Sequence, residues 1–182
     1  MSIFDERVNL KPYEYPHLLE FKTAIRQSYW VHDEFSFEGD VQDFRVNCTD
    51  AERSVIKKTM LAIAQVEVAV KTFWADIYDR LPVPEVGAVG MTFAESEVRH
   101  LDAYSHLLEL LGLNDAFERI EEIPALIDRV EYLNSALEGT GSRDERAFAH
   151  SILLFSIFIE HVSLFSQFLI MLSFDKYEKR FK

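Results

Sequence analysis

Residues 93–104 read FAESEVRHLDAY. Glu97 and His100 are three positions apart, which places both side chains on one face of an α-helix, and Tyr104 lies one turn further along that face. A carboxylate and an imidazole together suit iron, manganese or zinc. Surface helices also produce this pair by chance. A solvated Glu97 and a structural His100 therefore stay open at this point.

Two more carboxylates interrupt apolar helical segments. Glu67 lies in IAQVEVAV, residues 63–70, and Glu160 lies in a long apolar run near the C-terminus. A carboxylate in such surroundings is costly unless it is paired or binds a metal. Lys71, one turn after Glu67, could form an intrahelical ion pair with it. Glu160 has no Lys or Arg within one turn, so its charge must be met from another helix or by a metal. For His161 we expect a core position and a hydrogen bond to a backbone carbonyl.

Helical periodicity with few breaks predicts an all-α fold. Thr49 with Glu52 and Ser142 with Glu145 have the spacing of capping boxes, and Gly112 is a typical helix stop. We expect an extended arm up to Pro16 and an irregular segment over Val31–Asn47. Helices are expected from about Pro16 to Trp30, Thr49 to about Tyr78, Pro84 to about Leu111, Asn114 to about Glu122, Pro124 to Glu138, and Ser142 to about Phe174.

The last of these helices contains Ala147–Phe174, which has very few charged residues. Its length and composition also fit a transmembrane span. Glu160 and His161 lie in the middle of that stretch, however, and burying both in lipid would cost several kcal/mol. A helix that is apolar on all sides also suits the centre of a large helical domain, which is the interpretation we favour. The whole chain, 1–182, then forms one helical domain that does not enter a membrane.

Composition narrows the class of protein. The chain has 182 residues and a formal net charge of −12, so phosphate-rich nucleic acids and anionic membranes would repel it. A single cysteine, Cys48, excludes an internal disulfide framework and fits a reducing compartment. The N-terminus lacks the basic and apolar regions of a signal peptide. These features favour a cytoplasmic location.

The three carboxylates, considered together, are stronger evidence for a metal site than each of them alone. Di-iron and di-manganese helical bundles draw one Glu from each of two helices and a Glu-x-x-His pair from each of two more. Here Glu67 and Glu160 supply the single carboxylates, and Glu97 with His100 supplies one pair. A second helical Glu-x-x-His pair is missing, so four of the expected six ligands are present.

From about Trp30 to the C-terminus, the sequence resembles the small, radical-generating subunit of class I ribonucleotide reductase. The resemblance rests on the order of Trp30, Glu67, FAESEVRHLDAY and FIEHVSLFSQF. It implies a ferritin-like helical bundle with long central helices. It also implies a role for each matching position: a radical-relay tryptophan at Trp30, metal ligands at Glu67, Glu97, His100 and Glu160, and the radical tyrosine at Tyr104.

In that family the second Glu-x-x-His pair lies some thirty residues beyond the position of Glu160, roughly a dozen residues past Lys182. The resemblance therefore implies that these 182 residues are the N-terminal portion of a longer chain. The missing portion would include the C-terminal helices and the tail that docks on the large subunit. A homodimer is implied by the family alone.

Two residues depart from the iron–tyrosyl members of the family. The first ligand position is Glu67, where those members most often have Asp, and Lys71 is an unusual neighbour for the site. Both departures resemble a subgroup that uses two manganese ions, although two iron ions or a mixed pair also fit the ligands. In that subgroup the oxidised metal pair stores the oxidising equivalent, and Tyr104 forms no stable radical. Lys71 could help to hold an anionic oxidant such as superoxide.

The implied activity is that of ribonucleoside-diphosphate reductase. The small subunit draws an electron from the large subunit through an aromatic path that includes Trp30, and a cysteine radical in the large subunit starts reduction of the ribonucleotide. Two other classes stay open. A ferritin-like dimetal oxidase of the ligand-binding type would share the metal scaffold, and a non-enzymatic helical interaction module would merely pair its carboxylates. Tyr104 and Trp30 favour the reductase.

Overall fold

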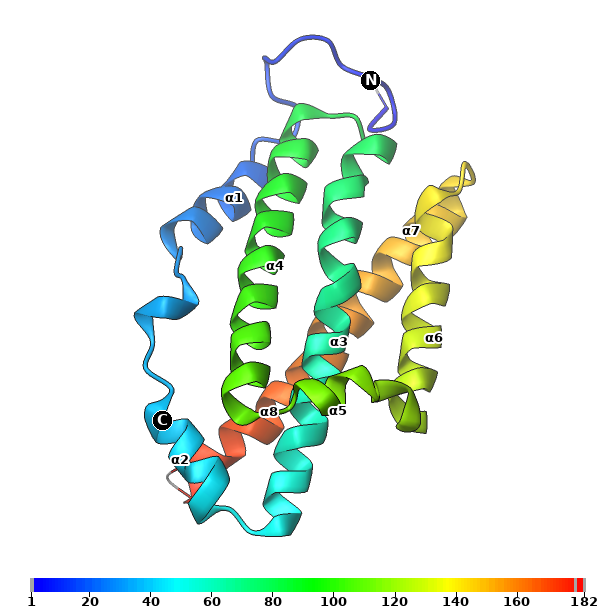
Figure 1. Ribbon diagram of the computed structural model, residues 1–182. Coiled ribbons are helices and arrows are strands. Elements are labelled where there is room, and N and C mark those ends of the chain that lie inside the picture. The colour runs from blue at the N-terminus through cyan, green and yellow to red at the C-terminus, as the bar shows by residue number, and fades with distance from the viewer. Residues whose placement is uncertain (1, 179, 182) are drawn as a thin grey trace. The chain divides into compact units, whose positions relative to one another are not determined.

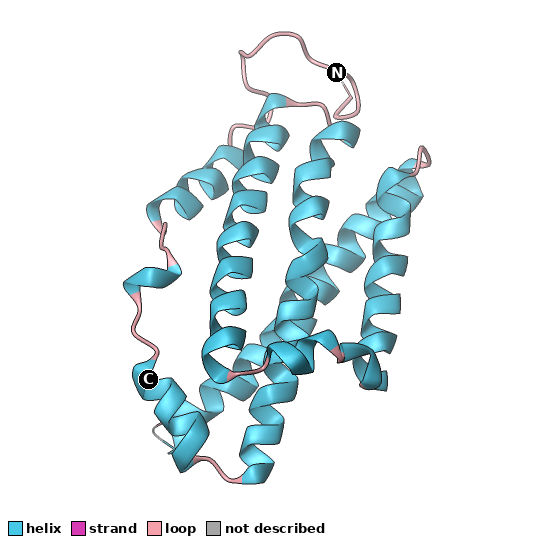
Figure 2. Cartoon of the chain, in the orientation of Figure 1, coloured by secondary structure: helices cyan, strands magenta, loops and turns pink. Residues whose placement is uncertain are grey.

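The computed structural model describes residues 2–178 and 180–181. Over this part of the chain, every regular element is helical and no strand occurs (Figure 2). The all-α prediction is confirmed. In chain order the elements are α1 Leu18–Gln27, η1 His32–Glu34, α2 Glu38–Gln42, η2 Asp43–Asn47, α3 Asp50–Arg80, α4 Pro84–Leu111, α5 Asn114–Glu118, η3 Ile120–Glu122, α6 Pro124–Glu138, η4 Gly139–Gly141, α7 Glu145–Leu153, η5 Leu154–Leu164, α8 Phe165–Ser173 and η6 Phe174–Glu178 (Figure 1).

The internal contacts of the chain divide it into two compact units. The first unit comprises residues 1–31 and 67–101, and the second comprises residues 32–66 and 102–182. One boundary lies between Val31 and His32, and the other two fall within helices α3 and α4. Each unit is therefore built from an early segment of the chain and a later one.

Two of the sequence signals for helix ends are confirmed. Glu52 accepts a hydrogen bond from the backbone N–H of Thr49 at 2.6 Å, and the Thr49 hydroxyl accepts one from the N–H of Glu52 at 3.3 Å. This reciprocal pair is the expected capping box before α3. At the end of α4, Gly112 has a φ of 70° and the N–H of Leu113 donates to Leu108 O at 2.8 Å. Glycine adopts that left-handed conformation without steric cost, which explains the stop.

The start of the last helix differs from the prediction. Asp144, not Ser142, is the N-cap, and its carboxylate accepts a hydrogen bond from the N–H of Arg146 at 3.0 Å. The Ser142 hydroxyl instead accepts from the N–H of Asp144 at 3.1 Å and closes the preceding turn. Both residues are good N-caps, and the negative charge of a carboxylate is additionally stabilised by the positive end of the helix dipole.

The segment expected to be irregular over Val31–Asn47 contains three short helical elements, η1, α2 and η2. They are too short to leave a helical period in the sequence. Phe44 is buried there and belongs to the core of the second unit. In contrast, α1 is shorter than predicted, because it ends at Gln27 and leaves Trp30 in an irregular connection.

The core of the second unit is apolar, and a half-buried cation on α6, Arg129, bonds to its backbone. Its buried side chains come mainly from the N-terminal half of α3 and from the end of α4. The Arg129 guanidinium on α6 donates to the carbonyl oxygen of Ala62 at 2.7 Å. Burial lowers the pKa of Arg129 to about 10, so it stays protonated at neutral pH. The half-buried guanidinium of Arg129 thus links α6 to the backbone of α3.

The helical run Glu145–Glu178 changes its hydrogen bonding along its length. Leu154–Leu164 and Phe174–Glu178 are π-helical, and both adjoin the α-helical segment α8. π-Helical segments are rare and are frequently found at functional sites. By length and composition this run could cross a membrane, and 17% of its most apolar window is buried. Large side chains along it are exposed: Ile157, Phe158, Val162, Phe165, Leu169 and Leu172.

Within the first unit, α4 approaches α3 closely at Gly90. A Cβ atom there would lie 2.6 Å from the carbonyl oxygen of Trp74 and 2.6 Å from Ile77 Cγ2. Trp74 also packs edge-on against Phe93, with the ring centroids 4.9 Å apart. Trp74 therefore packs where α3 and α4 meet, and Gly90 allows the two helices to approach each other.

Substituting Gly90 with alanine is expected to destabilise the protein by about 1–2 kcal/mol. Overpacking costs about 1–3 kcal/mol, and the improved helix propensity of alanine returns up to about 1 kcal/mol. The backbone oxygen of Trp74 cannot rotate away from a methyl group. Urea denaturation measures the effect. Gly39→Ala is the matched control, because its Cβ would meet nothing within 4 Å. Equal stability of the two variants would refute the close approach.

Candidate metal centre

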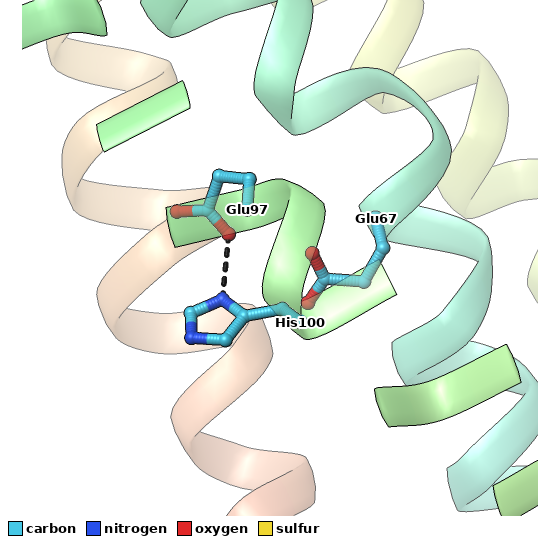
Figure 3. A group of neighbouring side chains, drawn as sticks. All are labelled: Glu67, Glu97 and His100. Carbon is cyan, nitrogen blue, oxygen red and sulfur yellow. Dashed lines mark hydrogen bonds and ion pairs between the residues drawn. The ribbon is translucent and has the colours of Figure 1, made fainter. Parts of the chain in front are cut away.

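The Glu-x-x-His pair lies on α4 with both side chains directed to one place. His100 Nδ1 and Glu97 Oε2 are 2.8 Å apart and share a hydrogen bond (Figure 3). The Glu97 side chain is 12% exposed and the His100 side chain 34%. The predicted common face of Glu97 and His100 is therefore present, and it is mostly shielded from solvent.

Glu67 on α3 completes a three-residue cluster. Its side chain is 1% exposed. One ligand atom from each of Glu67, Glu97 and His100 lies within 4.8 Å of the others (Figure 3). All three residues belong to the first unit. The structure therefore brings together three of the four ligands that the sequence analysis proposed.

The chemistry of this cluster fits a transition metal. Carboxylate oxygens and imidazole nitrogens bind first-row ions at about 2.0–2.2 Å, so two ligands of one ion are up to about 4 Å apart. The 4.8 Å spread of the three ligand atoms is close to that limit, and small side-chain rotations would close it. Two carboxylates and one imidazole also match half of the six-ligand set of a dimetal carboxylate site.

Lys71 lies one turn after Glu67 on α3 and is half-buried. Its ammonium donates hydrogen bonds to the backbone carbonyls of Glu67 at 3.3 Å and Val68 at 3.0 Å. These bonds keep the positive charge beside the helix turn that carries Glu67. The two bonds use two of the three ammonium hydrogens of Lys71 and hold its side chain near the cluster.

Trp30 reaches His100 from the irregular segment that follows α1. The indole and imidazole rings are stacked, with centroids 5.8 Å apart and planes inclined by 26°. Both residues belong to the first unit. The structure therefore brings the aromatic residue that was singled out in the sequence into contact with a candidate ligand.

The remaining candidates, Tyr104 and Glu160, belong to the second unit. Tyr104 is half-buried and packs against the apolar core of that unit. Glu160 is half-buried within the π-helical segment η5. His161 Nδ1 donates a hydrogen bond to the carbonyl oxygen of Ser156, 2.6 Å away, as expected, but the His161 side chain is exposed and not in the core. The five-residue separation of this bond follows the π-helical turn.

Two buried charged side chains of the first unit were not found from the sequence. Glu85 is fully buried at the start of α4, and Arg99 is 6% exposed beside His100. Glu85 directly follows Pro84, a pattern that suggested only a helix start. Arg99 lies inside the Glu-x-x-His motif, and an arginine on a helix is usually exposed to solvent. The partners of Glu85 lie at least 70 positions away in the sequence, and Arg99 contacts the Trp30 carbonyl across 69 positions, so the local sequence does not indicate these contacts.

The family model and the related sequences that match this chain all indicate the same protein family. A family model described as "Ribonucleotide reductase, small chain" matches residues 7–180. A probable ribonucleoside-diphosphate reductase small subunit of Invertebrate iridescent virus 3 is 27% identical over 97% of this chain and 51% of its own length. Its counterpart from Invertebrate iridescent virus 6 is 29% identical over 96% of this chain and 52% of its own length. The chain thus spans about half the length of these relatives.

Solved structures share the fold. A ribonucleotide reductase R2 subunit from Clostridium botulinum has a TM-score of 0.81 at 18% identity, covering 90% of this chain and 52% of that one. A putative class I ribonucleotide reductase from Bacillus halodurans has a TM-score of 0.82 at 18% identity, covering 90% of this chain and 59% of that one. These likenesses support the ferritin-like helical architecture.

Proposed function

The chain belongs to the ribonucleotide reductase small-chain family, and on that premise we propose that the full-length protein is the radical-generating subunit of a class I ribonucleoside-diphosphate reductase. The observation that carries the proposal is the buried cluster of Glu67, Glu97 and His100. Its donor set fits the dimetal cofactor of the family. The protein acts in the cytoplasm, as a homodimer, together with a large subunit that binds the ribonucleotide.

In this proposal Glu67, Glu97, His100 and Glu160 hold the metal pair together with a second Glu-x-x-His pair from further helices of the full-length protein. Those helices also cover the exposed apolar side chains along Glu145–Glu178. This assigns the apolar run to the inside of a larger bundle. A membrane is then not needed to explain its composition.

A redox-active metal pair supplies the oxidising equivalent when it is bound. The carboxylates of Glu67 and Glu97 neutralise its charge, and the protein around Glu67 keeps water away from that side. Trp30, stacked on His100, links the ligands to the path toward the large subunit. Tyr104, one helical turn beyond His100, is the residue that iron–tyrosyl relatives use as a radical.

Manganese is the metal that we favour, since Glu67 replaces the more usual aspartate and Lys71 lies beside it. The Lys71 ammonium is held at the carbonyls of Glu67 and Val68, where its charge can attract an anionic oxidant such as superoxide. Two iron ions or a mixed pair would use the same ligands.

The test is made on the full-length protein as isolated. Anomalous scattering at the manganese and iron edges is expected to reveal two ions beside Glu67, Glu97, His100 and Glu160, with manganese at both positions. Ribonucleoside diphosphates are expected to be reduced only when the large subunit is added. Oxygen consumption that depends on a substrate but not on the large subunit would instead indicate a dimetal oxidase.

The manganese assignment has its own spectroscopic test. After activation, we expect no tyrosyl-radical signal in the electron paramagnetic resonance spectrum, because the oxidising equivalent stays on the metal pair. Tyr104→Phe should therefore keep most of the reductase activity. A stable tyrosyl signal that disappears in Tyr104→Phe would contradict the manganese proposal and favour an iron–tyrosyl enzyme.

A further inference from the structure

The position of Trp30 is not set by helical hydrogen bonds. Helix α1 ends at Gln27 and the next helical turn begins at His32, so Trp30 lies in an irregular connection. Its indole nevertheless stacks on His100 at a centroid distance of 5.8 Å. An aromatic ring keeps such a place in an irregular segment only when nearby side chains hold the segment. A second side chain of α4, the helix that carries His100, also contacts this segment.

That side chain is Arg99, the residue directly before His100 on α4. Its Nη1 donates a hydrogen bond to the carbonyl oxygen of Trp30 at 3.4 Å. Its guanidinium carbon lies 4.5 Å from the ring centroid of Tyr29 and 5.9 Å from that of Trp30. One cation therefore contacts both the backbone and the rings of the segment that carries Trp30.

Glu95 fixes the orientation of this guanidinium. Nε of Arg99 lies 3.1 Å from each carboxylate oxygen of Glu95, one turn earlier on α4. Arg99 is 6% exposed, so its charge needs a partner to be stable there. The planar guanidinium can bind a carboxylate, bind a carbonyl and stack on a ring at once, which the ammonium of a lysine cannot do.

We propose that Arg99, aimed by Glu95, is a positioning residue that seats Trp30 against His100. Two adjacent residues of α4 then contact the same segment: Arg99 bonds the Trp30 backbone, and His100 stacks on the Trp30 indole. The seating is a property of the folded chain by itself. Its consequence for electron transfer through Trp30 rests on the proposed function, so the two are tested separately.

The seating is tested by ¹⁹F NMR of the metal-free, full-length protein labelled with 5-fluorotryptophan. The signals of Trp30 and Trp74 are assigned with Trp30→Phe and Trp74→Phe. In Arg99→Met we expect the Trp30 signal to move towards that of a solvent-exposed indole and to broaden, while the Trp74 signal keeps its position. Arg99→Lys should give a similar change, because charge alone does not provide the planar contacts.

Arg26→Met is the matched control, since Arg26 is an exposed arginine on α1 in the same unit. It should leave both signals unchanged. An unchanged Trp30 signal in folded Arg99→Met would overturn the proposal. If Arg99→Met fails to fold, Arg99→Lys and Glu95→Gln decide the matter. Glu95 is half exposed, so its substitution should fold, and an unmoved Trp30 signal in Glu95→Gln would then refute the proposed role.

The consequence for the reaction is measured with the large subunit present. We expect kcat of Arg99→Met to fall by about 10²-fold, because displacement of a reacting group by about 1 Å has an effect of that size. The KM for the ribonucleotide should stay unchanged, because the substrate binds elsewhere. If Arg99→Met moves the Trp30 signal but keeps a normal kcat, Arg99 positions Trp30 without affecting the rate of the reaction. A wild-type protein without reductase activity would overturn the proposed function and leave the seating result valid.

Discussion

Glu67→Ala in the full-length protein is expected to abolish stoichiometric metal binding. Glu67 is the most deeply buried carboxylate of the cluster, and it is the only member that α3 contributes. Loss of residues that merely support metal ligands lowers metal affinity by about 10–100-fold, so loss of a ligand should lower it by more than about 10²-fold. Metal content measured by inductively coupled plasma mass spectrometry is the first readout.

Thermal stability gives a second, independent readout of the same prediction. A ligand present at about 1,000 times its Kd stabilises the folded state by about 4 kcal/mol. Added manganese should therefore raise the Tm of the wild-type protein clearly and leave that of Glu67→Ala nearly unchanged. Glu109→Ala serves as the matched control, because Glu109 is an exposed carboxylate on α4. Its metal content and metal-induced Tm shift should equal those of the wild type.

The metal-free variants separate a metal ligand from a structural ion pair. Removing one partner of a buried ion pair costs about 3–5 kcal/mol. If Glu67 were only a structural charge, Glu67→Ala would lose that stability without any metal present, and manganese would bind neither protein. Wild-type metal content in Glu67→Ala would also refute Glu67 as a ligand.

The features that the sequence predicted correctly are those that depend on neighbours along the chain. The capping box of Thr49 and Glu52, the stop at Gly112 and the shared face of Glu97 and His100 each follow from spacing within one or two helical turns. Such local rules hold before tertiary packing is considered. The apolar surroundings of Glu67 were also visible, and its burial confirms that interpretation.

The features that were missed depend on distant partners or on backbone choices without a sequence pattern. Arg99 bonds the backbone of Trp30 across 69 positions, and no local rule anticipates that contact. The π-helical bonding of Leu154–Leu164 uses the same apolar residues that an α-helix would use. Ser142 and Asp144 are both competent caps, so the spacing to Glu145 did not discriminate between them. Each of these outcomes is set by the tertiary context.

Replacing Glu85, at the start of α4, is expected to have the second large effect, a loss of stability. Arg7 Nη2 lies 2.6 Å from its carboxylate, and the backbone N–H groups of Glu14 and Tyr15 donate to it at 2.7 and 3.3 Å. Glu85 is fully buried and the Arg7 side chain is 7% exposed. One carboxylate thus attaches the N-terminal arm of the first unit to α4, at the helix end where negative charge is favoured.

Glu85→Ala is expected to lower the free energy of unfolding by about 3–5 kcal/mol, because it leaves Arg7 buried without its carboxylate and removes the acceptor of two backbone groups. Urea denaturation measures the loss, and limited proteolysis should cut the arm faster. Glu20→Ala is the matched control, since Glu20 is an exposed acidic residue in the first turn of α1. Its stability should stay within about 0.5 kcal/mol of the wild type.

The dependence of stability on pH tests the same contact without removing the side chain. Burial alone would raise the pKa of Glu85, but hydrogen bonds from its own N–H, from Tyr15 and Glu14 and from Arg7 hold that pKa below its ordinary value of 4.5. A carboxyl whose pKa is lower in the folded state stabilises that state fully above the unfolded pKa. Its contribution is lost as the pH falls through the folded pKa. The wild type should therefore lose more stability than Glu85→Gln when the pH is lowered from about 5 to below the folded pKa, and parallel curves would refute the ion pair as the anchor of the arm.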